Sequence, residues 1–382
     1  MQKYPCLIVL LLLLCPGLQA RIELPVTVDS LDNGLTLLIC PDTTAPTVSV
    51  QTFVNCGSRD EDRAGITGLA HVFEHMMFRG TERYPDYHAA VARFGSQNNA
   101  YTTEDYTCYF VNAPAEFLEP ILDIESDRIR RLDFTREAFR TELGPVKEER
   151  RRGEEDSPEG WLEVELLKLA YTTHTYQHPV IGWEEDLEVN MTFEDGLEFK
   201  NRFYVPNNCV LSVCGNFEVA ELKNLIVKYF GEWERGVPYT PQIESEPPQE
   251  HERVQNYVWK DAQTVPLLQV AWHTGAAGYD LQRLAALQLL SDMLCSRSGR
   301  LTSLLKNDLA WVESIDADAQ LMKDPGLFLI SARLVATANL QVVTDTILAQ
   351  LEKLKQTPVS AAELTRARNS RRAQLIYRLE RP

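Results

Sequence analysis

The chain has 382 residues, which is long enough for two domains. Its apolar content of 44% and charged content of 24% are ordinary for a globular protein. The formal net charge of −17 argues against a nucleic-acid partner, because such a partner requires a basic face. A solvated acidic surface accounts for this charge.

The N-terminal segment has the features of a signal peptide. Lys3 supplies a positive charge, residues 6–15 are almost wholly apolar, and residues 16–20 resemble a cleavage region. The apolar run is too short to span a bilayer, and no other segment of the sequence could do so. We predict cleavage after Ala20 and export to the periplasm or the cell exterior. A lipid anchor at Cys15 is the alternative, although leucine is a poor residue before a lipidated cysteine.

Six cysteines would remain in the mature chain. An even number in an exported protein is compatible with disulfides. Most of them lie in strand-like runs, however, where a buried free thiol is equally natural. The sequence leaves the pairing open, and none of the six has the paired spacing of a zinc-thiolate site. They are Cys40, Cys56, Cys108, Cys209, Cys214 and Cys295.

The first half of the chain alternates β-rich segments with helical patterns. Turn residues bound the β-rich segments, and one helical pattern carries a pair of histidines. A stretch rich in Pro, Glu and Gln, residues 236–252, follows as a linker. The elements predicted before it are strands at 35–40, 47–56, 106–112 and 209–215, the histidine helix, and helices near 115–131, from Thr135 onward and at 219–230.

The histidine helix contains an H-x-x-E-H motif, made by His71, Glu74 and His75. Positions i and i+4 lie on one face of a helix, so both imidazoles can point at one metal ion. Glu74 lies near the same face, where it can polarise a metal-bound water. Three such residues on one helix can also occur by accident. The flanking sequence is apolar, however, and bare imidazoles would be costly there without a partner.

The second half repeats the order of the first. Strands are predicted at 267–273 and 326–335, and helices at 281–295, at 340–354 and from Ser360 onward. The offset of roughly 225 positions indicates a duplicated domain. Segment 287–292, where the histidine helix should recur, offers no ligand set.

The two halves therefore have different predicted roles. We expect a catalytic zinc-binding domain over residues 21–235 and a non-catalytic domain over 253–382 that walls a substrate space. The second copy lacks a counterpart of about residues 159–233. Either the chain is a fragment, or something else covers the exposed core. The expected fold class is α+β, with two duplicated α/β-sandwich-like domains, each a mostly antiparallel sheet with helices on one side.

A catalytic zinc usually takes three protein ligands and a water. Segment 137–152 offers Glu142, Glu148 and Glu149. Glu142 and Glu149 are two helical turns apart and share a face, whereas Glu148 lies about 100° away from Glu149. The same segment contains many arginines, so a solvated, salt-bridged surface helix explains it equally well. Spacing alone leaves the third ligand open.

Several sequence runs together resemble one family. The chain is similar, over about residues 28–382, to the inverzincin peptidases of the pitrilysin, insulin-degrading enzyme and mitochondrial processing peptidase type. Its compact length and exported start look most like the bacterial processing-peptidase-like branch. The runs that carry the resemblance are Asn33–Leu35, Gly57–Glu61, Gly68–Thr81, Asn99–Thr102 and Val146–Arg151.

The resemblance implies a role for each matching residue. It makes His71, His75 and Glu149 the ligands of one Zn²⁺ per chain, and Glu74 the carboxylate that activates the water. Glu142 matches an acidic residue that supports the site. Gly144 and Pro145 lie between the two glutamates, and because proline kinks a helix, Glu142 and Glu149 need not share a face as the spacing suggests.

The resemblance also implies how substrate is held. Asn99 and Ala100 match a strand that binds substrate backbone by strand addition. From the residues alone, Asn99 is better interpreted as a turn residue. The family also supplies Arg and Tyr groups to the substrate from its second domain or a partner subunit, and the sequence does not locate these groups here.

The expected function is that of a zinc-dependent metalloendopeptidase acting on peptides or unfolded polypeptide segments. One alternative is a peptide-binding or assembly subunit with the family fold and little activity of its own. Another is a zinc hydrolase with a non-peptide substrate. Expected partners are the peptide substrate and a second subunit, either the same chain or a related one, with no nucleic acid and no stable membrane span.

Overall fold

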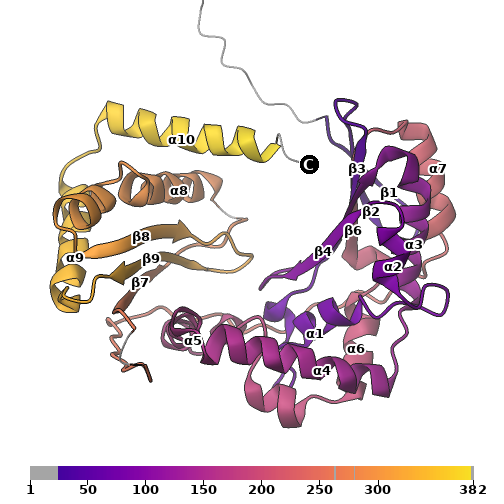
Figure 1. Ribbon diagram of the computed structural model, residues 1–382, viewed down its shortest axis with the longest axis horizontal. Coiled ribbons are helices and arrows are strands. Elements are labelled where there is room, and N and C mark those ends of the chain that lie inside the picture. Colours follow the sequence, from indigo (N-terminus) through magenta and orange to yellow (C-terminus); the bar gives the residue numbers. More distant parts are fainter. Residues whose placement is uncertain (1–24, 262–263, 279, 380–382) are drawn as a thin grey trace, which may run out of the picture.

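Two β-sheets with helices packed against them form the protein, and the predicted α+β class is confirmed (Figure 1). The computed structural model describes residues 25–261, 264–278 and 280–379. The predicted signal peptide lies outside these residues. None of the described helices is long and apolar enough to cross a membrane. All six cysteines of the described part are free thiols.

The first sheet has six strands in the order β1-β2-β6-β3-β5-β4. Neighbouring strands are antiparallel except for the parallel pair β2–β6. The predicted strands are confirmed to within a few residues, whereas β1 was not predicted. β4 is the edge strand, so the interpretation of Asn99 as a turn residue was wrong. The bounds are β1 (Thr27–Ser30), β2 (Thr36–Pro41), β3 (Thr47–Val54), β4 (Gln97–Thr102), β5 (Thr107–Pro114) and β6 (Cys209–Gly215).

Seven α-helices accompany this sheet in the described part of the chain. Helices α3 and α7 contact each other and cover one face, where the strands contribute alternate buried side chains (Figure 1). Helix α1 lies at the β4 end of the sheet and contacts β4, α4 and α6. The bounds are α1 (Leu69–Met76), α2 (Tyr87–Ala92), α3 (Leu118–Arg131), α4 (Arg136–Arg150), α5 (Pro158–Ala170), α6 (Phe193–Phe203) and α7 (Val219–Phe230).

The second half repeats the central part of the first. Its sheet has the order β7-β9-β8, all antiparallel, and this matches β3-β5-β4 in strand order and direction. In chain order, α8 takes the position of α1, and α9 and α10 take those of α3 and α4. The described residues contain no counterparts of β1, β2 and β6 in this half. The bounds are β7 (Leu267–His273), α8 (Leu281–Cys295), β8 (Val312–Ala319), β9 (Leu327–Leu334), α9 (Leu340–Gln356) and α10 (Ala361–Leu379).

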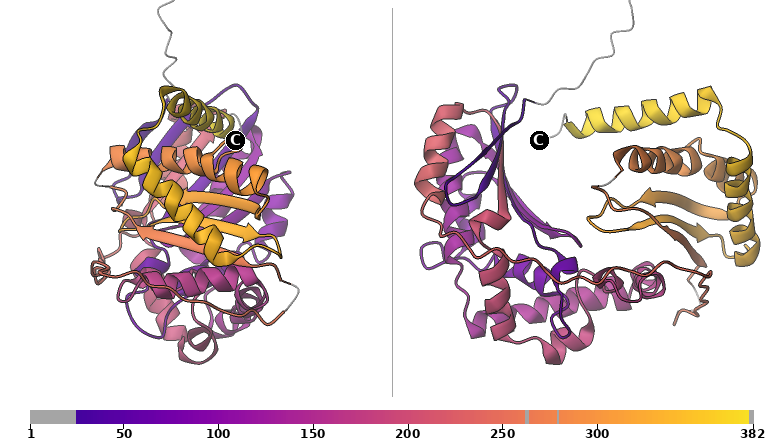
Figure 2. Two further views of the ribbon diagram at one scale, coloured as in Figure 1. Left: turned by 90° about the vertical axis from the view of Figure 1, so that its left-hand side faces the viewer. Right: turned by 180° about the vertical axis from the view of Figure 1, so that it is seen from behind.

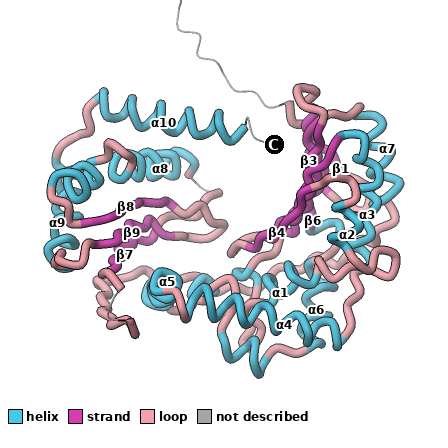
Figure 3. The backbone as a smooth tube through the Cα atoms, in the orientation of Figure 1, coloured by secondary structure: helices cyan, strands magenta, loops and turns pink. Residues whose placement is uncertain are grey.

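A stretch without helix or strand, residues 231–266 in their described part, connects the halves and includes the predicted linker. Figure 2 shows this stretch running past α5. Glu246 holds it in place by accepting hydrogen bonds from the backbone N–H groups of Thr172 and Thr173 at 2.9 and 3.0 Å. Figure 3 shows the two sheets at opposite ends of the molecule, with α1, α4 and α5 beneath them.

The turn between β8 and β9 joins the two halves directly. The backbone N–H of Lys323 donates to the Asp105 carboxylate at 2.8 Å. Asp324 forms an ion pair with Arg59 at 2.6 Å and lies 3.0 Å from Nε2 of His174. A small apolar cluster lies beside these polar contacts and includes residues of both halves. Its buried members are Ala170, Tyr171, Tyr176, Met322 and Leu327.

Candidate metal centre

Helix α1 carries the H-x-x-E-H motif with its apolar side in the core of the first half. Leu69, Val72, Phe73 and Met76 are fully buried, with relative exposures of 0%. The Phe73 ring stacks on two further phenylalanine rings at centroid distances of 5.2 and 5.3 Å. This packing fixes the rotation of the helix about its axis and so determines where the remaining side chains point.

A glycine and a buried carboxylate hold the start of α1. Gly68 has φ of 89°, and a Cβ there would lie 2.3 Å from the carbonyl oxygen of Ile181, so only glycine fits. The Glu61 carboxylate accepts hydrogen bonds from the backbone N–H groups of Gly68 and Ala70, both at 2.7 Å. Sequence reasoning did not assign this role to Glu61, whose only signal was its place in the Gly57–Glu61 run.

Helix α4 brings Glu149 to the two histidines of α1. Nε2 of His75 lies 3.1 Å from Oε2 of Glu149, and Nε2 of His71 lies 3.8 Å from Oε1. The three potential ligand atoms all lie within 4.8 Å of one another. Two imidazole nitrogens and one carboxylate oxygen form a donor set that suits Zn²⁺ and leaves a fourth position for water. The residues therefore fit the metal that the motif predicts.

Glu142 contacts the opposite nitrogen of the same imidazole. Its Oε1 lies 3.3 Å from Nδ1 of His75, and its Oε2 accepts a hydrogen bond from Arg79 at 3.3 Å. The sequence left open whether Pro145 separates Glu142 from Glu149, and the structure shows that α4 continues through Pro145. Pro145 and the residue four positions before it are both exposed, so water can bind the carbonyl that loses its partner.

The two histidines have opposite electrostatic environments in the metal-free protein. Burial, together with the charge of His75, lowers the pKa of His71 to about 4. Burial also acts to lower the pKa of His75, but the hydrogen bonds that the protonated ring donates to Glu142 and Glu149 outweigh it and raise the pKa to about 9. The hydrogen bond from His75 lowers the pKa of each glutamate in return. His71 is therefore ready to coordinate as a neutral ring, whereas His75 must first lose a proton.

Glu74 lies beside this group and is half-buried. Its Oε2 accepts a hydrogen bond from the Thr102 hydroxyl at 2.6 Å. Burial raises the pKa of Glu74, whereas hydrogen bonds from Thr102 and the charge of His75 act to lower it, and the charge of Glu149 acts to raise it. Sequence reasoning missed Thr102, although it lies in the Asn99–Thr102 run that carries part of the resemblance.

The remaining candidates lie on strand β4 and helix α4. Asn99 is exposed and Ala100 is buried on edge strand β4, which packs against α1. The structure shows no hydrogen bond from the described residues that ties Asn99 to the histidines. Glu148 pairs with Arg151 and Arg152 at 2.9 and 2.7 Å, so the spacing argument correctly separated it from the group around Glu149.

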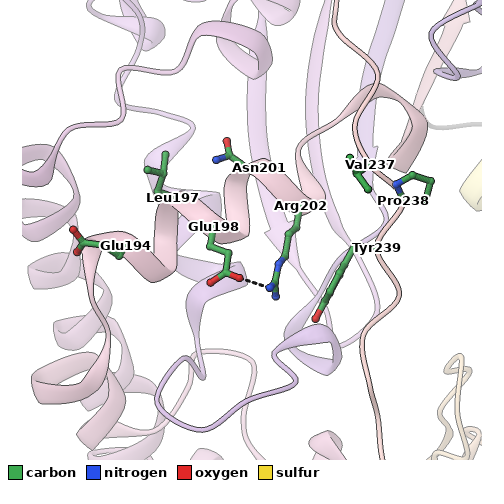
Figure 4. Close-up of a pocket in the computed structure, with 8 residues that line it drawn as sticks. All are labelled: Glu194, Leu197, Glu198, Asn201, Arg202, Val237, Pro238 and Tyr239. Carbon is green, nitrogen blue, oxygen red and sulfur yellow. Dashed lines mark hydrogen bonds and ion pairs between the residues drawn. The ribbon is translucent and has the colours of Figure 1, made fainter.

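A surface hollow of about 500 Å³ lies elsewhere, between α6 and the connecting stretch (Figure 4). Its floor includes Arg202, whose guanidinium lies 4.3 Å from the centre of the Tyr239 ring. None of the candidate site residues lines it. The lining residues are Glu194, Leu197, Glu198, Asn201, Arg202, Val237, Pro238 and Tyr239.

Comparison with known proteins assigns the chain to a family. The model of insulinase, peptidase family M16, matches residues 37–183, and that of the peptidase M16 inactive domain matches residues 190–371. The two matches together cover most of the chain, and the protein belongs to peptidase family M16. The family resemblance inferred from the motifs is thereby confirmed.

Two curated relatives and one solved structure illustrate the match. Zinc protease PqqE of Helicobacter pylori is 29% identical over 359 residues, which cover 92% of this chain and 79% of that protein. The uncharacterized zinc protease YmxG of Bacillus subtilis is 27% identical over 91% of this chain and 83% of its own. The crystal structure of a protease from Helicobacter pylori has a TM-score of 0.88 at 27% identity, and the match covers 94% of this chain and 86% of that one. The chain is thus similar to proteins named zinc proteases.

Proposed function

We propose that this protein is a zinc-dependent metalloendopeptidase that hydrolyses peptides or unfolded polypeptide segments. The observation that carries the proposal is the grouping of His71, His75 and Glu149, whose ligand atoms lie within 4.8 Å of one another beside the Glu74 carboxylate. Similarity to proteins named zinc proteases supports the same class of activity.

In this proposal each residue has one task. His71, His75 and Glu149 hold the ion, and Glu142 orients the His75 ring through Nδ1. A bound zinc ion supplies a Lewis acid and lowers the pKa of a coordinated water towards about 7. The Glu74 carboxylate would accept a proton from the attacking water and donate it to the leaving amine.

Substrate binding is assigned to the edge of the first sheet. Strand β4 has one unpaired edge, and an extended peptide can add to such an edge through backbone hydrogen bonds. Asn99 and Ala100 lie in the middle of this strand. The first half serves as the catalytic domain. The second half, whose helix α8 carries no H-x-x-E-H motif, is non-catalytic and bounds the substrate-binding space.

The test combines metal content with turnover. The purified protein should contain one zinc ion per chain and cleave a library of unstructured peptides, and a chelator should abolish cleavage. Glu74→Gln should retain the zinc and lose cleavage, because the amide cannot accept the proton. Zinc binding without peptide turnover in the wild-type protein would instead favour a peptide-binding subunit. Cleavage by Glu74→Gln at the wild-type rate would refute the mechanism.

Export and assembly complete the proposal. The N-terminal segment directs the chain out of the cytoplasm, and the mature chain pairs with a second copy or a related subunit. N-terminal sequencing of the protein from a native extracytoplasmic fraction tests the first statement, and an uncleaved N-terminus would contradict it. Light scattering of the purified protein, alone and mixed with a related subunit, tests the second.

A further inference from the structure

The hydroxyl of Thr102, the last residue of strand β4, contacts Glu74, the proposed proton acceptor. It donates to Oε2 of Glu74 at 2.6 Å. Among the described side chains, Thr102 alone donates a hydrogen bond to this carboxylate. This hydrogen bond restricts rotation of the carboxylate about its terminal torsion.

The backbone around Thr102 is held from two directions. Thr102 is opposite Thr107 at the end of the β4–β5 ladder, and the turn is closed by a hydrogen bond from Thr103 N–H to the Tyr106 carbonyl at 2.9 Å. The second half holds the same turn, since both the backbone N–H and the ammonium group of Lys323 donate to Asp105, at 2.8 and 2.7 Å. A residue on such a constrained turn can fix a partner's orientation with little freedom of its own.

We propose that Thr102 is a positioning residue that holds the Glu74 carboxylate in the orientation required for proton transfer. This inference rests on the proposed peptidase function and goes beyond it by adding a residue outside the metal-binding group. Its effect should appear in kcat, because the hydrogen bond orients a group that acts on the reacting water and makes no contact with the metal.

Thr102→Val removes the hydroxyl and preserves the shape of the side chain, whereas Thr102→Ser keeps the hydroxyl. We expect Thr102→Val to lower kcat by about 10- to 100-fold with KM within about twofold and zinc content unchanged. Thr102→Ser should recover most of the activity. Thr107→Val is the matched control, because it removes a buried threonine hydroxyl at the position opposite Thr102, and this hydroxyl donates to the Cys56 carbonyl instead of to Glu74.

Four kinetic results would overturn the inference. These are a wild-type kcat in Thr102→Val, a change confined to KM, an equal loss in Thr102→Ser, or an equal loss in the Thr107→Val control. Loss of zinc from Thr102→Val would also overturn it, since the residue would then be supporting the metal-binding group. Failure of the proposed function is distinguishable, because in that case the wild-type protein itself would not cleave peptides.

Discussion

Nδ1 of His75 lies 3.3 Å from the Glu142 carboxylate, while Nε2 of the same ring lies 3.1 Å from Glu149. One imidazole is therefore held between two glutamates that lie two turns apart on α4. In this arrangement Nε2 can bind the same metal ion as Glu149, while the contact of Nδ1 with Glu142 fixes the orientation of the ring. The packing of α4 against α1 thus decides the geometry of the whole group.

Replacing Glu142 should weaken metal binding without removing a ligand. Glu142→Ala is expected to lower the apparent zinc affinity by about 10- to 100-fold, because the His75 ring loses the partner that fixes its orientation. Competition with a chromophoric chelator measures the affinity. Glu137→Ala removes an exposed glutamate from the first turn of the same helix and serves as control. Equal affinities in the two variants would contradict the supporting role.

Glu149 and Glu148 provide a matched pair of neighbouring carboxylates. Glu149→Ala removes a proposed ligand, so zinc should be lost during dialysis and activity should disappear. Glu148→Ala removes only exposed ion pairs with Arg151 and Arg152, which contribute little. That variant should keep its zinc and its activity. Metal analysis after dialysis distinguishes the two, and the opposite result would assign the third ligand to Glu148.

Zinc binding should depend on pH through His75. Because the pKa of this ring in the metal-free protein is raised to about 9, a proton must leave before the ring can coordinate. Apparent zinc affinity should therefore rise by up to about tenfold per pH unit as the pH approaches about 9. Chelator competition across this range measures the slope. A flat profile would show that His75 is already neutral.

The raised pKa of His75 also predicts how the stability of the metal-free protein varies with pH. The folded pKa of His75 lies above its ordinary value of 6.5, so the folded state binds the proton more tightly than the unfolded state. The resulting contribution of His75 to the free energy of unfolding is fully present below about pH 6.5 and is lost as the pH rises through about 9. Urea unfolding at several pH values measures it, and Glu142→Ala should reduce the dependence.

The apolar side of α1 should determine stability more than any group at the metal site. Phe73 is fully buried and stacks on Phe134 and Phe199. Phe73→Ala is expected to cost about 3–5 kcal/mol of unfolding free energy, since it leaves a cavity in the core. Urea unfolding of the metal-free protein measures the loss. Val189→Ala, at an exposed position, is the control and should change stability by less than about 0.5 kcal/mol.

Much of the site follows from local periodicity. The spacing of His71, Glu74 and His75 predicts a shared helical face whatever the rest of the chain does, because 3.6 residues per turn is a local property. Most strands and helices were predicted close to their observed bounds for the same reason. The edge strand β4 was not evident from its residues, since Gln97–Thr102 is polar and lacks strand-like alternation. Pairing with β5 makes it a strand.

By itself the sequence determined the H-x-x-E-H helix, the duplicated order of elements, and the seven-residue spacing of Glu142 and Glu149. It could not show whether the helix continues through Pro145, and it could not show that the Thr102 hydroxyl contacts Glu74. Those relationships join residues far apart in the chain. They depend on how α4 and β4 pack against α1, and only tertiary structure determines contacts of that kind.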